Sequence, residues 1–145
     1  MSCRAIGVPK NMQIESPTFI TTASVQEVST FISVPKNLER ILPHGRIQDF
    51  TARESDCSFT VHGGITISLV LVSSSLNKVI YKQGEKSPFP FDLTIVLTEG
   101  DGGSQGKIHF NGEVSMFIAM VAKGPLTELF KDMANNIKSV LEAPR

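Results

Sequence analysis

The sequence predicts an α+β protein in which a curved antiparallel sheet wraps around one long C-terminal helix. Three observations support this fold class. Apolar and polar residues alternate with a period of two through most of the region between Arg46 and Ala122. One apolar stripe with helical period follows, from Pro125 to Glu142. Two short segments with helical spacing precede the alternating region. Within that region no helical pattern separates the strands, so parallel crossovers are not expected.

The first part of the chain is predicted to form one strand and two short helices. Met12 to Ile20 has the pattern of a strand. Ser24 followed by Glu27 forms a capping box, in which hydroxyl and carboxylate satisfy each other's backbone N–H groups at a helix start. This helix ends before Pro35, and a second, very short helix lies between Pro35 and Pro43.

Six further strands are predicted, which makes a sheet of seven strands with the first beside the last. Turn-forming residues separate the strands at the spacing typical of antiparallel sheets. The last strand is expected to continue through Met116 to Ala122, where both faces are apolar. Gly124-Pro125 then opens the long helix, because proline is favoured at the first helical position. The breaks between strands fall at Ser55-Asp56, Gly63-Gly64, 73–77, 84–88 and 100–106.

The C-terminal helix is expected to have about 18 residues and a length of roughly 27 Å at the usual rise per residue. That length is enough to cross the concave face of the sheet. Its polar residues fall mainly on the opposite side. The apolar stripe consists of Leu126, Leu129, Phe130, Met133, Ala134, Ile137, Val140 and Leu141.

Composition argues against nucleic-acid binding and membrane crossing. The 145 residues include 14 basic and 14 acidic ones without clustering, so no basic patch points to nucleic acid. No apolar run approaches the roughly 20 residues that span a bilayer. Cys3 and Cys57 are expected to be free thiols in a reducing cytoplasm. We expect residues 1–11 to form a flexible tail and residues 12–145 to form a single domain.

Three stretches of the sequence carry a family resemblance: CSFTVHGGITISLVLV, GEKSPFPFDLTIVL and AKGPLTELFKDMANNIKSVLE. With the order of elements, they resemble a bacterial branch of small proteins in the SRPBCC, or START-like, superfamily. That superfamily includes the birch pollen allergen, lipid-transfer domains and polyketide cyclases. The resemblance covers Met12 to Glu142. It implies the helix-grip fold and an internal cavity between the sheet and the long helix.

A cavity at this place is also physically reasonable, because a sheet that curls around one helix does not always fill its concave side. The expected function is non-catalytic binding or transport of a small apolar or amphipathic molecule, such as a lipid, a sterol or a polyketide-like compound. The candidate lining residues are all apolar, and a plain packed core would use the same residue types. They are Phe59, Val61, Ile67, Leu69, Phe91, Leu93, Ile95, Phe110, Leu129, Phe130 and Met133.

The sequence offers little for metal, cofactor or catalytic chemistry. The three histidines lack the spacing of a metal site. His44 is expected to be solvated in a loop. His62 and His109 alternate with inward-facing residues, so they are expected to face solvent, without an obvious acidic partner. The glycine-rich stretch 100–107 does not match a phosphate loop and precedes a strand, so it is predicted to be a hairpin turn.

Two alternatives stay open. One is an enzyme of the polyketide cyclase or dehydratase type, in which a few polar groups in the cavity move protons. The ionisable candidates are Asp49, Tyr81, Glu85 and Asp92, and each is expected to be exposed. The other is a structural domain that binds a partner and whose cavity is filled by side chains. An ionisable side chain inside the cavity would favour the enzyme.

Overall fold

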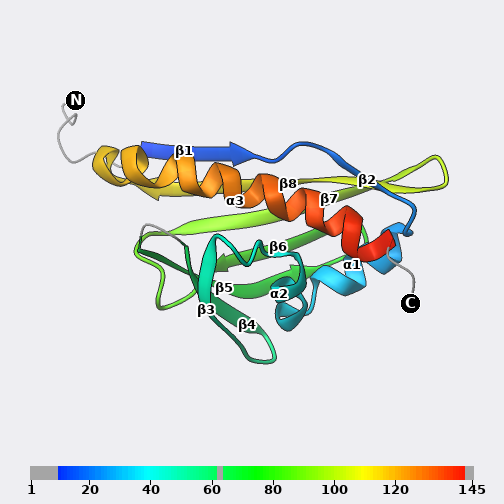
Figure 1. The fold of residues 1–145 in the computed structure, drawn as a ribbon, viewed down its shortest axis with the longest axis horizontal. Helices are drawn as coiled ribbons and strands as arrows, with labels where there is room; N and C mark the ends of the chain where they lie inside the picture. Colours follow the sequence, from blue (N-terminus) through cyan, green and yellow to red (C-terminus); the bar gives the residue numbers. More distant parts are fainter. Residues whose placement is uncertain (1–9, 62–63, 143–145) are drawn as a thin grey trace.

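The computed structural model describes residues 10–61 and 64–142, which form the predicted α+β helix-grip architecture (Figure 1). The strands are all antiparallel and follow the order β1-β8-β7-β6-β5-β4-β3, with the short β2 also paired to β8. The elements are β1 (Lys10–Glu15), β2 (Phe19–Thr21), α1 (Val25–Ile32), the 3-10 helix η1 (Pro35–Asn37), α2 (Leu38–Ile41), β3 (Ile47–Ala52), β4 (Asp56–Val61), β5 (Ile65–Ser74), β6 (Lys78–Gln83), β7 (Phe91–Gly100), β8 (Gly103–Val114) and α3 (Met116–Glu142).

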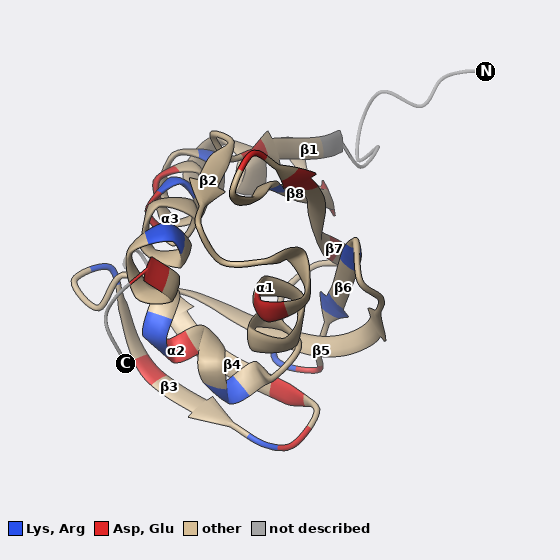
Figure 2. Ribbon diagram, turned by 90° about the vertical axis from the view of Figure 1, so that its right-hand side faces the viewer, with Lys and Arg blue, Asp and Glu red and all other residues tan. Residues whose placement is uncertain are grey.

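The sheet curls until its two edges lie on either side of α3 (Figure 2). On one side α3 packs against β1, β2 and β8. On the other side Arg46, which directly precedes β3, forms an ion pair with α3, and its Nε atom lies 2.6 Å from Oδ2 of Asp132. The side-chain amide of Asn136 donates a hydrogen bond of 2.9 Å to the carbonyl of Ile41 in α2. The long helix therefore closes the open side of the curled sheet.

The predicted first strand forms two strands, and both pair with β8, the predicted seventh strand. The first strand therefore lies beside the last, as predicted. Lys10 and Asn11, which the sequence assigned to the tail, belong to β1. The strand breaks at Pro17, which has no backbone N–H for the sheet. The hydroxyl of Ser16 instead accepts the N–H of Ile108 at 3.0 Å.

The two predicted short helices are present. At the start of α1 the Ser24 hydroxyl accepts the N–H of Glu27 at 3.0 Å, and the Glu27 carboxylate accepts the N–H of Ser24 at 2.9 Å. The capping box is therefore confirmed. The second short helix consists of η1 and the single turn of α2, and its apolar residues Leu38, Ile41 and Leu42 are buried against the core.

Replacing Ser24 with alanine is expected to lower the free energy of unfolding by about 0.5–2 kcal/mol, because the N–H of Glu27 loses its acceptor. Urea unfolding followed by circular dichroism measures this change. Ser139→Ala, at an exposed position inside α3, is the matched control and should cost nothing. Equal unfolding midpoints for Ser24→Ala and the wild type would contradict the capping role.

Strands β3 to β8 are the six segments that the alternation predicted. The glycine-rich stretch 100–107 contains the predicted hairpin turn, although residues 103–107 already belong to β8. Gly100 pairs with Gly103, so Asp101 and Gly102 form the turn between β7 and β8. Gly102 has a φ of 74°, which glycine adopts without strain. In the edge strand β3 the register shifts at a bulge around Asp49, which has a φ of 59°.

The long helix is longer than predicted. It comprises Met116–Glu142, so the predicted extension of the last strand through Met116 to Ala122 is wrong. The predicted helix start at Pro125 is also wrong. Strand β8 ends at Val114, which pairs with Lys10, the first described residue of β1.

Ser115 provides the actual start of α3. Its hydroxyl accepts the N–H of Ile118 at 3.2 Å, and its carbonyl accepts the N–H of Ala119 at 3.0 Å. These contacts satisfy donors that a helix start otherwise leaves open. Pro125 consequently lies inside the helix, where it cannot donate to the carbonyl of Val121.

The predicted apolar stripe of α3 faces the concave side of the sheet and packs into one core with the inward-facing residues of the strands. Val140, at the end of the stripe, is only half-buried. The buried members are Leu126, Leu129, Phe130, Met133, Ala134, Ile137 and Leu141.

Candidate functional site

All eleven predicted lining residues lie in the core between the sheet and α3. None of them is more than 4% exposed. They come from four strands and one helix, so the fold brings together residues that are far apart in the sequence. They are Phe59 and Val61 of β4, Ile67 and Leu69 of β5, Phe91, Leu93 and Ile95 of β7, Phe110 of β8, and Leu129, Phe130 and Met133 of α3. That they contact a ligand stays a prediction.

A cluster of phenylalanine rings connects the sheet to α3. The ring centroid of Phe110 lies 4.9 Å from that of Phe91 and 5.1 Å from that of Phe130. Phe89, which was not among the predicted lining residues, meets Phe91 edge-on at 5.8 Å. A Cβ atom at Gly112 would lie 3.2 Å from the rings of Phe110 and Phe89, so the glycine leaves room for the cluster. The rings form the most aromatic part of the core.

Two ionisable side chains are buried in the described part of the chain, Tyr81 and Cys57. Tyr81 was expected to be exposed, but it alternates with solvent-facing residues of β6, and its hydroxyl donates to the carbonyl of Ile32 at 2.6 Å. Burial raises the pKa of Tyr81. Burial, reinforced by the charge of Asp56, raises the pKa of Cys57 to about 12. Both groups therefore stay protonated at neutral pH.

The other three ionisable candidates do not reach the core. Asp49 and Glu85 are exposed, as expected. Asp92 is half-buried and lies between Phe91 and Leu93 on β7, whose side chains point inward, so Asp92 faces the convex side. Apart from Tyr81 and Cys57, no ionisable side chain of the described residues is buried in the core, and the buried Ser104 hydroxyl of β8 donates to the carbonyl of Ala23 at 2.8 Å.

His109 lies on the convex side of the sheet, as the alternation predicted, and is half-exposed. It does have an acidic partner, because its Nδ1 atom lies 3.4 Å from Oε2 of Glu15. Lys107 also contacts Glu15, with its Nζ atom 3.0 Å from Oε1, and this hydrogen bond is the main cause that lowers the pKa of the carboxyl group. The partner was missed because Glu15 comes from β1 and faces His109 only through the sheet register.

The remaining histidines add no site. His44 is exposed, as expected. His62 and the strand break predicted at Gly63 lie outside the described residues. Within residues 10–61 and 64–142, no three side chains of His, Cys, Asp or Glu come together in a way that could hold a metal ion.

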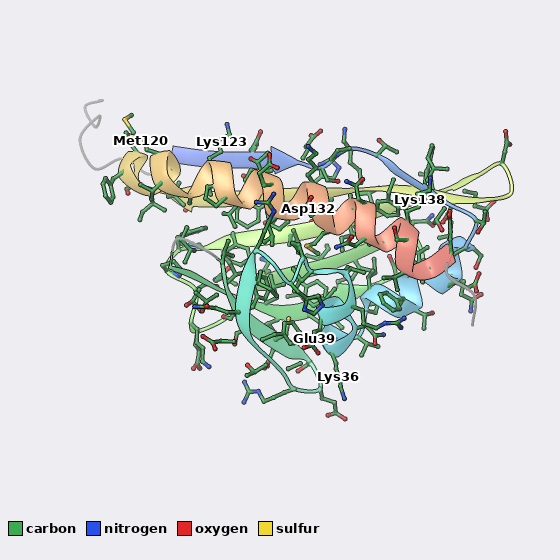
Figure 3. The ribbon with its side chains drawn as sticks, viewed as in Figure 1. Lys36, Glu39, Met120, Lys123, Asp132 and Lys138 are labelled. Carbon is green, nitrogen blue, oxygen red and sulfur yellow. The ribbon has the colours of Figure 1, made fainter. Side chains whose placement is uncertain are left out.

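The first two turns of α3 are apolar on every side. Phe117 and Met120 are 70% and 77% exposed, and Met116 and Val121 are also exposed. Figure 3 shows Met120 pointing away from the sheet. Ala122, on the inner side, is fully buried. Even so, no helix in the described part of the chain has the length and apolar character that a bilayer crossing requires.

An open groove of about 750 Å³ lies outside the core, where α1, η1 and α2 meet the last turn of α3. Phe31 and Val34 form an apolar floor together with Val140 and Leu141 of α3. The guanidinium carbon of Arg40 lies 5.4 Å from the centroid of the Phe31 ring. None of the eleven predicted residues lines this groove, so it is a separate feature of the surface.

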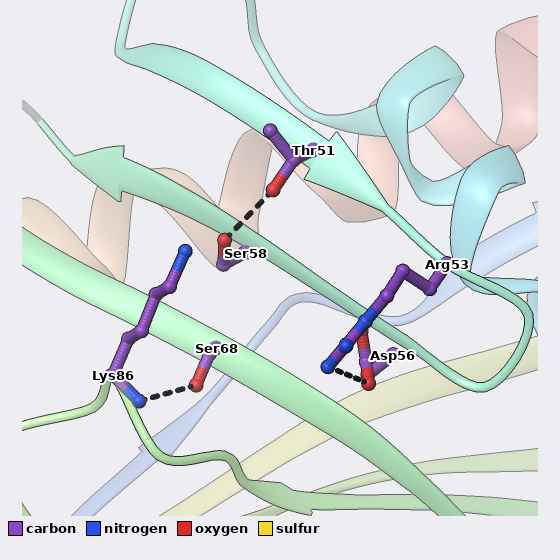
Figure 4. Close-up of polar contacts among 6 residues, drawn as sticks. All are labelled: Thr51, Arg53, Asp56, Ser58, Ser68 and Lys86. Carbon is purple, nitrogen blue, oxygen red and sulfur yellow. Dashed lines mark hydrogen bonds and ion pairs between the residues drawn. The ribbon is translucent and has the colours of Figure 1, made fainter.

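A second pocket, of about 520 Å³, lies on the convex side of β3, β4 and β5 (Figure 4). Thr51, Ser58 and Ser68 occupy paired positions on these strands. Thr51 Oγ1 and Ser58 Oγ are 3.0 Å apart, and Ser68 Oγ accepts the N–H of Lys86 at 3.2 Å. Several polar groups of this pocket bond to one another, and none of the eleven predicted residues lines it.

No family model matches the chain, and no curated protein matches its sequence. Solved structures do resemble it. Truncated norcoclaurine synthase from Thalictrum flavum is 16% identical with a TM-score of 0.72, over 95% of this chain and 98% of its own. The KanY protein is 14% identical with a TM-score of 0.75, over 92% and 99%. The di-domain ARO/CYC protein BexL, from the BE-7585A biosynthetic pathway, is 16% identical with a TM-score of 0.66, over 93% and 51%.

At these identities the likeness shows the fold alone. It agrees with the helix-grip fold that the sequence predicted. A shared fold does not carry a shared activity, because function depends on the residues of the site.

Proposed function

We propose that this protein binds a small apolar or amphipathic molecule between the concave face of the sheet and α3. The observation that carries the proposal is the chemistry of that interior, where all eleven candidate side chains present apolar surface. A related observation supports it. A point mutant of norcoclaurine synthase with the same fold, 15% identical with a TM-score of 0.67, was solved in complex with a transition-state analogue. A helix-grip fold can therefore hold a small molecule.

The binding energy would come from removing the ligand's apolar surface from water. Burial contributes about 25 cal/mol per Å², so about 200 Å² of apolar ligand surface gains roughly 5 kcal/mol. The core is closely packed, so its side chains have to move apart when a ligand binds. Met133 suits such a wall, because its unbranched thioether side chain adapts to ligands of different shape. Phe130 lies beside it on the same face of α3 and contributes the larger apolar surface.

An enzyme of the cyclase or dehydratase type is the second candidate, and the named neighbours motivate it. Such an enzyme needs an ionisable group in the cavity to move protons. The buried ionisable groups of the described residues are Tyr81, whose hydroxyl is bonded to the carbonyl of Ile32, and Cys57, whose pKa is about 12. Burial keeps both groups protonated at neutral pH, so neither serves as a general base, which favours binding over catalysis. Turnover of a substrate would reverse this preference.

Met133→Trp is expected to abolish the binding of an environment-sensitive apolar fluorescent probe, because the larger ring takes up the volume that a bound molecule would need. Overpacking of this kind also costs about 1–3 kcal/mol of stability. Fluorescence titration measures the binding, and urea unfolding checks that the variant is folded.

Met120→Trp is the matched control, because Met120 lies on the same helix and is 77% exposed. It should leave the probe affinity unchanged. The proposal fails if the wild-type protein binds no fatty acid, sterol or aromatic probe. In that case the protein is better explained as a structural domain that binds a partner and whose interior is filled by side chains. Native mass spectrometry of freshly purified protein gives an independent test, because a bound small molecule would add to its mass.

A further inference from the structure

The groove between α1, α2 and the end of α3 contains an arginine that has no carboxylate partner among residues 10–61 and 64–142. Three arginines lie in this part of the chain. Arg46 and Arg53 each form an ion pair with an aspartate, at 2.6 and 2.8 Å. Arg40 instead lies over the ring of Phe31, with its guanidinium carbon 5.4 Å from the ring centroid. Within these residues no carboxylate forms an ion pair with Arg40, and the contact with the Phe31 ring holds its charge at the groove.

This placement leaves Arg40 able to bind an anion. The face of a phenyl ring attracts a guanidinium, while the N–H groups at the edge of the guanidinium stay available for hydrogen bonds. Those N–H groups match the two oxygens of a carboxylate. Asn37, which also lines the groove, donates one N–H of its side-chain amide to the carbonyl of Phe31 at 3.1 Å. The second N–H of that amide can donate to the same ligand.

The surface beside Arg40 is apolar. Val34 is 44% exposed, and Phe31 and Val140 are half-buried. The volume of about 750 Å³ lies within the range of about 300–1,000 Å³ that is usual for small-molecule sites. A cation at the edge of an apolar floor fits a ligand with an anionic head and an apolar body.

The negative charge of the groove lies further along α1. Glu27 is one helical turn before Phe31, and its carboxylate accepts the N–H of Ser24 at the start of the helix. The Glu27 carboxylate is thus engaged at the start of α1, and an anionic head is favoured next to Arg40.

We propose that the groove binds a carboxylate with an alkyl chain, with the carboxylate on Arg40 and Asn37 and the chain on Phe31, Val34 and Val140. This site shares no residue with the core site proposed above. It goes beyond that function and does not depend on it.

Dodecanoate and uncharged dodecanol serve as probes of equal chain length, and calorimetric titration measures their affinities. Arg40→Gln is expected to weaken dodecanoate binding by about tenfold, the loss of one solvent-exposed charge-assisted contact, and to leave dodecanol binding unchanged. Lys36→Gln is the matched control, because Lys36 is an exposed cation on the neighbouring turn that does not line the groove. Figure 3 shows Lys36 pointing away from α3.

Amide spectra separate this site from the core. Dodecanoate is expected to shift the backbone signals of Phe31, Val34 and Val140, and to do so in the Met133→Trp variant as well. The inference is overturned if Arg40→Gln leaves dodecanoate affinity unchanged, or if the shifts are confined to core residues such as Met133. Dodecanoate bound at the groove by a protein that binds no probe in its core would support this inference while the proposed function fails.

Discussion

Phe130→Ala is expected to lower the free energy of unfolding by about 3–5 kcal/mol, the largest loss that any single truncation in α3 should produce. The Phe130 side chain is 2% exposed, and its ring centroid lies 5.1 Å from that of Phe110 on β8. Truncation removes this contact between the helix and the sheet. It also leaves a cavity whose walls relax only in part, which adds to the cost.

Phe117→Ala is the matched control for this prediction, because it removes the same side chain from the same helix at a position that is 70% exposed. Its cost should stay within about 0.5 kcal/mol, as for other surface substitutions. Urea unfolding of both variants measures the difference. The folded Phe130→Ala protein should keep its affinity for an apolar probe, because truncation leaves a cavity under α3. Equal stabilities of the two variants would show that α3 does not pack on the sheet through Phe130.

The positions that the sequence predicted best are those whose direction follows from periodicity. Phe91, Leu93 and Ile95 alternate along a single strand, so they share a face wherever that strand lies. Leu129 and Met133 lie four residues apart on α3 and share a face in the same way. All five are buried in the core, because a face of this composition has to leave water.

Features that depend on how distant elements meet could not be predicted in this way. The pairing of Glu15 with His109 requires the register between β1 and β8. The burial of Tyr81 requires α1 to pack over β6, so that the phenol reaches the carbonyl of Ile32. The groove at Arg40 exists only because α1, α2 and α3 converge there. Periodicity within one element carries no information on any of these contacts.

The beginning of α3 was predicted wrongly because two local signals conflict. Gly124-Pro125 is a common helix start, and the apolar run before it resembles a buried strand. In the structure β8 ends at Val114, and Ser115 caps the helix that follows. Pro125 is then an interior proline, which is an unfavourable place for that residue.

Pro125→Ala is therefore expected to stabilise the protein. Alanine restores the hydrogen bond to the carbonyl of Val121 and is about 3 kcal/mol more favourable than proline inside a helix. Proline also restricts the unfolded chain, which offsets this gain by up to about 1 kcal/mol. The free energy of unfolding should rise by about 2 kcal/mol, measured by urea unfolding.

Whether Pro125→Ala raises or lowers the free energy of unfolding tests where α3 begins. If Pro125 occupied the first position of the helix, its missing N–H would cost nothing, and replacing it would lower stability by up to about 1 kcal/mol. Gly124→Ala is the companion variant, because a Cβ atom at Gly124 meets nothing within 4 Å. Inside a continuous helix it should add about 0.5–1 kcal/mol. If both substitutions lower stability, the helix starts at Pro125 and the first two turns of α3 are not helical in solution.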